Sequence, residues 1–210
     1  MSKRGIKART LRRRSQVRTP RPCILIVCEG SRTEPSYFNR LKKELRLASV
    51  EVWVEHGNSA PISVVEHARR LRDRRKRSST HAPFDRVWCV MDVEDPQPHR
   101  SLNEAHDKAQ QEKFSLALSN PCFEYWFLLH FERTSRQMTT ENAKQFLKEH
   151  LPNYDKEVPF DELLAHTETA IANAEGVISE KHYGEDLRNC NPSTHVHRLV
   201  LELRGHAKSG

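Results

Sequence analysis

The sequence predicts an α/β fold in which an open, parallel sheet of about four strands is flanked by helices. Two continuous apolar runs, residues 23–28 and 87–91, lack polar alternation and are therefore typical of strands covered on both faces. Segments of helical periodicity alternate with such strands, which is the order of βαβ units. At 210 residues the chain is long enough to bury a core without disulfide bonds.

The first half of the chain is expected to form three strands and two helices. Glu34 and Pro35 suit the first turn of the first helix, because an acid there meets the positive end of the helix dipole and proline loses no hydrogen bond. The expected elements are a strand at 23–28, a helix through 37–47, a half-buried strand at 50–54, a helix at 61–76 and a strand at 86–91.

The second half is expected to be mainly helical. Ser119 or Asn120 is expected to cap, and Pro121 to open, a buried aromatic helix that runs to Phe131. The other expected elements are a helix at 102–112, a fourth strand at 114–118 and helices at 141–151, 160–183 and 193–204. We expect residues 1–21 to form a disordered basic arm, 22–132 the α/β core, and 133–210 a helical extension packed on that core.

Carboxylates follow both apolar runs. Glu29 comes directly after the first run, and Asp92, Glu94 and Asp95 close the second. Ligands of open parallel sheets bind beyond the carboxyl ends of the strands, so these acids are expected to converge. Carboxylates brought together repel one another unless a hard cation lies among them, which makes Mg²⁺ or Mn²⁺ the expected cofactor. Such a centre is typical of phosphoryl chemistry, and Gly30 would let the backbone approach a ligand closely.

Positive charge is concentrated in two segments. Nine of the 35 basic residues fall within 1–21, which carries no acid, so the remaining chain holds 26 basic and 28 acidic residues. The second segment is 69–77. Both can neutralise nucleic-acid phosphates, although a charge run is more often a solvated helix face or a solubilising tail. The candidate nucleic-acid contacts are Arg12, Arg13, Arg14, Arg69, Arg70, Arg72, Arg74 and Arg75.

Cysteine usage and hydropathy favour a cytoplasmic protein that does not enter a membrane. The five cysteines are odd in number and include no Cys-x-x-Cys pair, which favours free thiols in a reducing compartment. No apolar segment approaches the length that spans a bilayer, and the N-terminal residues lack the apolar stretch of a signal peptide.

Three short segments stand out together. They are 26–30 (IVCEG) with Thr33-Glu34 and Tyr37-Phe38 after it, 119–131 (SNPCFEYWFLLHF) and 191–194 (NPST). In this combination the chain resembles the RloB-like family of bacterial proteins over about residues 22–204. Members of that family are encoded beside restriction or phage-defence genes and an AAA-type ATPase. The resemblance therefore implies an effector of antiviral defence with an ATPase partner protein.

The RloB-like family is in turn similar to Toprim domains, the catalytic module of topoisomerases, primases and overcoming-lysogenization-defect nucleases. Their pattern is Glu-Gly after the first strand and Asp-x-Asp after a later one. The resemblance places the glutamate on Glu29 and the first aspartate on Asp92. The second falls on Glu94, which keeps the charge but lengthens the side chain by one methylene, and Asp95 is a candidate substitute. Glu34 resembles an additional acid of the nuclease branch and is a candidate ligand for a second metal.

Three further polar residues accompany the aromatic stretch. Asn120, Glu124 and His130 are candidates to hydrogen-bond the metal ligands from behind, although lone polar groups among aromatic residues are more often satisfied core residues.

The function hypothesis from these residues is a Mg²⁺-dependent nuclease that cleaves phosphodiester bonds in RNA, such as tRNA, or in DNA. The alternative is a non-catalytic nucleic-acid-binding or regulatory subunit of an ATPase complex. A primase or topoisomerase ranks last, because no second large domain is evident.

Overall fold

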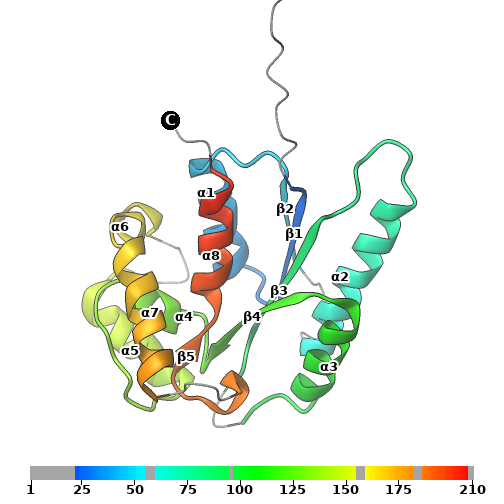
Figure 1. Ribbon diagram of the computed structural model, residues 1–210. Helices are drawn as coiled ribbons and strands as arrows, with labels where there is room; N and C mark the ends of the chain where they lie inside the picture. Colours follow the sequence, from blue (N-terminus) through cyan, green and yellow to red (C-terminus); the bar gives the residue numbers. More distant parts are fainter. Residues whose placement is uncertain (1–21, 55–59, 95–96, 155–158, 182–185, 208–210) are drawn as a thin grey trace, which may run out of the picture.

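The fold is a mixed α/β arrangement around one five-stranded sheet, which confirms the predicted class (Figure 1). The computed structural model describes residues 22–54, 60–94, 97–154, 159–181 and 186–207, so the basic arm at 1–21 lies outside the described residues. In the order β2-β1-β3-β4-β5, the first four strands are parallel and the last is antiparallel. The strands are β1 (Ile24–Cys28), β2 (Val50–Val54), β3 (Arg86–Asp92), β4 (Ser115–Asn120) and β5 (Ser193–Thr194).

The direction of winding reverses at β1. The chain passes from β1 to β2 on one side, then returns past β1 to β3 on the other. Figure 1 shows the helices of these two crossovers, α1 (Thr33–Glu44) and α2 (Pro61–Lys76), on opposite faces of the sheet, with α3 (Leu102–Glu112) beside α2. In a sheet wound this way, the space beyond the carboxyl ends of β1 and β3 is the expected ligand-binding position.

Two apolar cores follow from the pleat of the strands. Leu25 and Val27 of β1 face α2 and α3, whereas Ile24, Ile26 and Cys28 face the opposite side. All five side chains are fully buried, which is why β1 is a continuous apolar run rather than an alternating one. The smaller core lies under α2 and α3, and the larger one lies under α1 and the helices of the last third of the chain.

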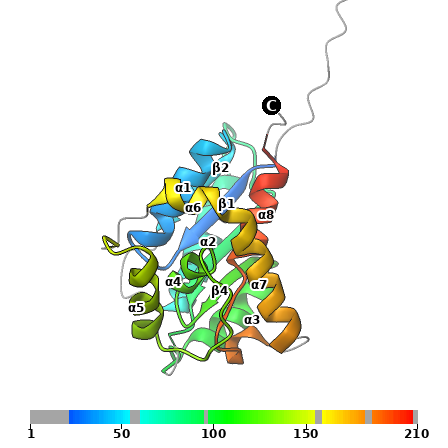
Figure 2. The ribbon, with the colours of Figure 1, turned by 90° about the vertical axis from the view of Figure 1, so that its left-hand side faces the viewer.

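The helices after β4 cover the α1 face of the sheet (Figure 2). Helix α4 contacts α5 and α7, α7 contacts α8, and α8 contacts β4. Tyr37 and Phe38 of α1 lie edge-on to Phe123, and Tyr37 also packs against Phe127, so aromatic rings join α1 to the α4 segment. These helices are α4 (Glu124–Leu128), α5 (Thr140–His150), α6 (Phe160–Ala165), α7 (Thr167–Lys181) and α8 (Val196–Gly205), with a 3₁₀ turn η1 at Leu187–Asn189.

Several boundaries expected from the sequence in this region are wrong. Ser119 and Asn120 do not cap a helix, because both belong to β4: Ser119 pairs with Asp92 of β3 and Thr194 of β5, and Asn120 pairs with Ser193 of β5. The aromatic helix, expected to open at Pro121 and run to Phe131, spans only Glu124–Leu128. The last helix begins at Val196 rather than at residue 193, because Ser193–Thr194 form β5.

The helix expected at 160–183 divides into α6 and α7. The helix α6 ends at Ala165 and α7 begins at Thr167, whose hydroxyl donates to the carbonyls of Leu163 and Leu164 in the last turn of α6. Among the described residues, no helix is long and apolar enough to cross a membrane.

Candidate active site

Glu29 and Asp92 meet at the point where the winding of the sheet reverses. Asp92 is the last residue of β3, and Glu29 directly follows β1. The backbone N–H of Glu29 donates to the carbonyl of Val90 (3.0 Å), which extends the ladder between the two strands by one bond. The Glu29 carboxylate accepts the backbone N–H of Asp92 at 3.1 Å from Oε2. The two acids predicted from strand ends therefore lie next to each other.

Glu34 lies at the start of α1 and turns back toward the end of β1. Its side chain is buried, and Oε1 accepts the backbone N–H of Gly30 at 3.2 Å. A Cβ atom added at Gly30 would lie 2.1 Å from Oε2 and 2.4 Å from Oε1 of Glu34. Only a glycine at this position leaves room for the Glu34 carboxylate, so the Glu-Gly pair of the sequence has a steric reason here.

Glu124 contributes a fourth acid from the first residue of α4. It is buried, its Oε1 accepts the Tyr154 hydroxyl at 3.3 Å, and Lys144 Nζ of α5 lies 3.9 Å from the same oxygen. These two partners come from the segment after β4, which carries no recognisable motif at either position. Sequence reasoning included Glu124 but missed Lys144 and Tyr154, because nothing in the spacing of residues 140–154 marks them.

Burial and the charges of neighbouring acids raise the pKa values of Glu29, Asp92 and Glu34. Burial raises the pKa of Glu29 to about 7, with further contributions from the charges of Glu94 and Glu34, although the N–H of Asp92 opposes the shift. Burial raises the pKa of Asp92 well above its usual range, and the charges of Glu34, Glu124 and Glu29 add to this. The pKa of Glu34 is also raised by burial and by Glu124. Such mutual repulsion favours a cation or protons in this space.

The donor set fits a hard divalent cation. All four side chains offer carboxylate oxygens, the ligands that Mg²⁺ and Mn²⁺ prefer. Asp92 Oδ1 is buried and has no hydrogen-bond partner among the described residues, which leaves one oxygen available to a ligand. Within the same described ranges, no three His, Cys, Asp or Glu side chains are gathered tightly enough to surround one ion. The acids thus share an electrostatic environment without forming a closed coordination shell.

Glu94 occupies a different position from the other acids. Its side chain is exposed, its backbone has φ of 60°, and its N–H donates to the carbonyl of Pro121 at 2.9 Å. Its charge nevertheless contributes to the raised pKa of Glu29. Asp95, the candidate substitute for Glu94, lies outside the described residues.

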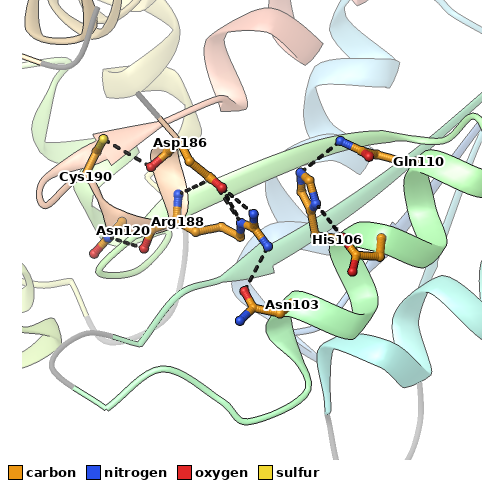
Figure 3. A network of polar contacts seen from close by, with 8 residues as sticks. Asn103, His106, Gln110, Asn120, Asp186, Arg188 and Cys190 are labelled. Carbon is orange, nitrogen blue, oxygen red and sulfur yellow. Dashed lines mark hydrogen bonds and ion pairs between the residues drawn. The ribbon is translucent and has the colours of Figure 1, made fainter. Parts of the chain in front are cut away.

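Asn120 belongs to a polar network at the end of β4 (Figure 3). Its Nδ2 donates to the carbonyl of Arg188 at 3.4 Å, and its Oδ1 is buried without a partner among the described residues. The Arg188 guanidinium pairs with Asp186 and donates to Asn103 Oδ1 of α3 at 2.8 Å. The network fixes η1 between α3 and β4, beside the strand end that carries Asp92.

His130 is a core residue in this fold. Its Nδ1 lies 3.0 Å from the carbonyl of Trp126, and its ring packs edge-on against the Trp126 ring. Burial lowers its pKa to about 4, so the imidazole is neutral near pH 7. We find no hydrogen bond or ion pair between His130 and the four acids.

The C-terminal arginines of α2 lie toward the amino ends of the strands, whereas the acids lie at the carboxyl ends. Arg75 reaches the start of β1, where it donates to Cys23 Sγ at 3.4 Å, whereas Glu29 follows the end of that strand. Arg72 pairs with Asp73 and Glu112 and covers the Phe114 ring, so much of its side chain supports the fold.

The remaining candidate arginines differ in exposure. Arg70 lies 4.0 Å from Glu66, Arg74 is exposed, and Arg69 is half-buried. The candidates in the basic arm, Arg12, Arg13 and Arg14, lie outside the described residues.

Comparison with known proteins gives one match. A family model described as RloB-like protein matches residues 24–203, which includes all four acids and most of the chain. No curated protein and no solved structure matches the chain.

Proposed function

The chain belongs to the RloB-like family, and we propose that it is a metal-dependent nuclease that cleaves phosphodiester bonds in RNA, such as tRNA, or in DNA. The observation that carries the proposal is the contact between Glu29 and Asp92 at the switch point of a parallel sheet. The unpartnered Oδ1 of Asp92 supports it, since a buried carboxylate oxygen without a hydrogen bond is costly unless a ligand compensates it.

Each acid has a role in this proposal. Glu29 and Asp92 would hold Mg²⁺ or Mn²⁺ directly, and Glu34 would extend the ligand set toward the start of α1. Glu94, on the exposed loop after β3, would complete the shell from the solvent side. A bound divalent cation supplies charge neutralisation at the phosphate and a more acidic water. Tyr154 and Lys144 would orient Glu124, through the hydroxyl at 3.3 Å and the ammonium at 3.9 Å.

We also propose that the protein acts with an AAA-type ATPase as the effector of an antiviral defence system. Membership of the RloB-like family supports this part. The ATPase would control when the site meets its substrate, so a purified chain without the partner need not cleave. Activity must therefore be measured with and without the neighbouring ATPase.

The test is a Mg²⁺ and Mn²⁺ titration of cleavage of tRNA, plasmid and single-stranded DNA. Wild type is expected to cleave at least one of these only when a divalent cation is present, and Glu29→Gln and Asp92→Asn are expected to lower the rate by about 10²-fold or more. Glu202→Gln is the matched control, because Glu202 is a partly buried acid that accepts Trp88 Nε1 near the opposite end of β3.

Two results would overturn the nuclease assignment. One is cation-dependent cleavage that both acid variants retain at the wild-type rate. The other is the absence of cleavage by the reconstituted chain and ATPase on all three substrates, which would assign the chain the role of a binding or regulatory subunit.

A further inference from the structure

A hollow of about 180 Å³ lies beside the edge strand β2, on the face covered by α2. Its lining includes Trp53 of β2, Leu71, Arg74 and Arg75 of α2, and His81 and Phe84 of the segment before β3. The hollow extends from Trp53, which lies level with Val27 of β1, to Arg75, which reaches the start of that strand, and none of the four acids lines it. No part of the proposed nuclease mechanism uses it.

Trp53 is exposed in a way that the other two tryptophans are not. Its exposed fraction is 42%, against 6% for Trp88 and 0% for Trp126. Its Nε1 donates to Glu51 Oε2 at 3.2 Å, which fixes the orientation of the indole. An oriented and accessible aromatic face is the feature on which unpaired bases stack in proteins that bind single strands.

Arg75 forms the opposite wall of the hollow, and three contacts fix its guanidinium. The Arg75 guanidinium lies over the Phe84 ring at 4.8 Å, and it pairs with Glu51, the same acid that orients Trp53. Arg75 Nε also donates to the carbonyl of Ala82 at 2.7 Å. Glu51 therefore accepts a hydrogen bond from Trp53 and pairs with Arg75, so both side chains are oriented before a ligand binds.

Charge around the hollow favours an anion. Arg74, Arg75 and Lys76 form the last turn of α2, and Arg77 follows it. These cations outweigh the partial negative charge of about half a unit at the helix C-terminus. Arg74 is exposed and forms no ion pair with any described residue. The nine basic residues of 1–21 precede Pro22 in the chain, and the next residue, Cys23, contacts Arg75.

We propose that this hollow binds an unpaired base of a single-stranded nucleic acid, stacked on Trp53, while Arg74 and the neighbouring basic residues hold the flanking phosphates. The hollow is smaller than the pockets of roughly 300 Å³ and above that take drug-sized ligands, which suits one ring system. A base within a duplex is already stacked, so the site selects single strands or unpaired loops. The inference rests on the proposed function for its substrate class and deepens it.

Binding can be measured apart from cleavage. In EDTA, single-stranded oligonucleotides of about 15 nucleotides, in DNA and RNA forms, are titrated against the full chain while tryptophan fluorescence and oligonucleotide anisotropy are recorded. Because Trp88 and Trp126 are buried, quenching reports on Trp53. Single strands are expected to quench the tryptophan fluorescence of the wild-type protein. A duplex of the same sequence is expected to bind several-fold more weakly than the single strand.

Variants test the stacking directly. Trp53→Ala is expected to weaken single-strand binding by about 5- to 150-fold, which corresponds to the loss of one stacked base. Trp53→Phe keeps a ring and is expected to retain most of the affinity while losing the quenching signal. Leu201→Ala is the matched control, since Leu201 is equally exposed at 42% on α8, and it is expected to bind like wild type.

Three outcomes would overturn the inference. They are equal affinity of Trp53→Ala and wild type, equal affinity for single strand and duplex, and quenching by poly-glutamate but by no oligonucleotide, which would assign the hollow to an acidic protein partner. Because no metal is present, a catalytic failure of the four acids leaves all of these binding results unchanged.

Discussion

The Glu29 carboxylate accepts the backbone N–H of Asp92, so the acid that follows β1 is bonded to the end of β3. This bond stabilises the ionised form of Glu29, but burial and the neighbouring charges outweigh it and raise its pKa to about 7. A site that holds its acids so close in the metal-free state is expected to be unstable by itself and to gain stability from a cation.

Asp92→Asn is therefore expected to stabilise the metal-free protein while it removes the response to metal. At a pH where the wild-type Asp92 carboxylate is ionised, the substituted amide carries no charge to bury, and a gain of about 1 kcal/mol, or about 2–4 °C in Tm, is expected. Mg²⁺ at 100 times its Kd should stabilise wild type by about 2.7 kcal/mol and the variant by much less. Thermal unfolding in EDTA and in Mg²⁺ measures both effects. A variant that is less stable than wild type in EDTA would contradict the repulsion argument.

Gly30→Ala is expected to impair the site more than the fold. The added Cβ would displace the Glu34 carboxylate, which is the flexible end of a side chain, and break its bond to the Gly30 N–H. The loss of one hydrogen bond costs about 0.5–1.5 kcal/mol in the free energy of unfolding. Urea unfolding should give this small change, while cation-dependent cleavage falls at least tenfold. Cleavage at the wild-type rate would show that the position of Glu34 does not matter.

Arg72→Ala and Arg74→Ala are expected to separate stability from nucleic-acid binding. Arg72 pairs with Asp73 and Glu112 and covers the Phe114 ring, so its truncation should lower the free energy of unfolding by about 1–2 kcal/mol. Arg74 is exposed, so its truncation should leave stability within about 0.5 kcal/mol. Arg74→Ala should instead weaken oligonucleotide binding and reduce the salt dependence of the binding constant by about one unit of slope. Reversed effects of the two variants would show that Arg72 makes the phosphate contact.

His130 is expected to contribute to acid unfolding. Burial lowers its pKa to about 4, so between that value and its unfolded value near 6.5 the unfolded chain binds more protons. The free energy of unfolding therefore rises with pH across this window, and on the order of 3 kcal/mol is lost as pH falls from 6.5 to 4. His130→Gln keeps a donor for the Trp126 carbonyl and should flatten this slope in urea unfolding measured at several pH values. Parallel curves for the two proteins would contradict the prediction.

The sequence was sufficient to predict the sheet core and two of its acids. The apolar runs that form β1 and β3 are typical of strands covered on both faces, and acids that follow two parallel strands are expected at the same end of the sheet. The resemblance also singled out Glu34, whose contact with Gly30 gives a physical reason for its position, and its role as a ligand of a second metal stays a prediction.

Other parts of the site depend on contacts between distant segments. The two-residue strand Ser193–Thr194 has no periodicity to detect, and it forms only because β4 offers free backbone groups. Tyr154 and Lys144 reach Glu124 through the packing of α4 on α5, which no spacing within either segment encodes. The exposure of Glu94 follows from a local backbone turn with positive φ, a conformation that glutamate adopts only rarely.

The antiparallel strand β5 also has a consequence for the order in which the protein can mature during synthesis. It comes about 70 residues after β4, and only after it does the chain supply α8, which covers β4. Until β5 and α8 have been synthesised, the outer edge of β4 and the part of the sheet that α8 covers stay open to other chains, which is the condition that favours misassociation. A nascent chain paused before residue 193 would therefore be expected to bind chaperones, although β1 and β3, which lead to Glu29 and Asp92, are already synthesised.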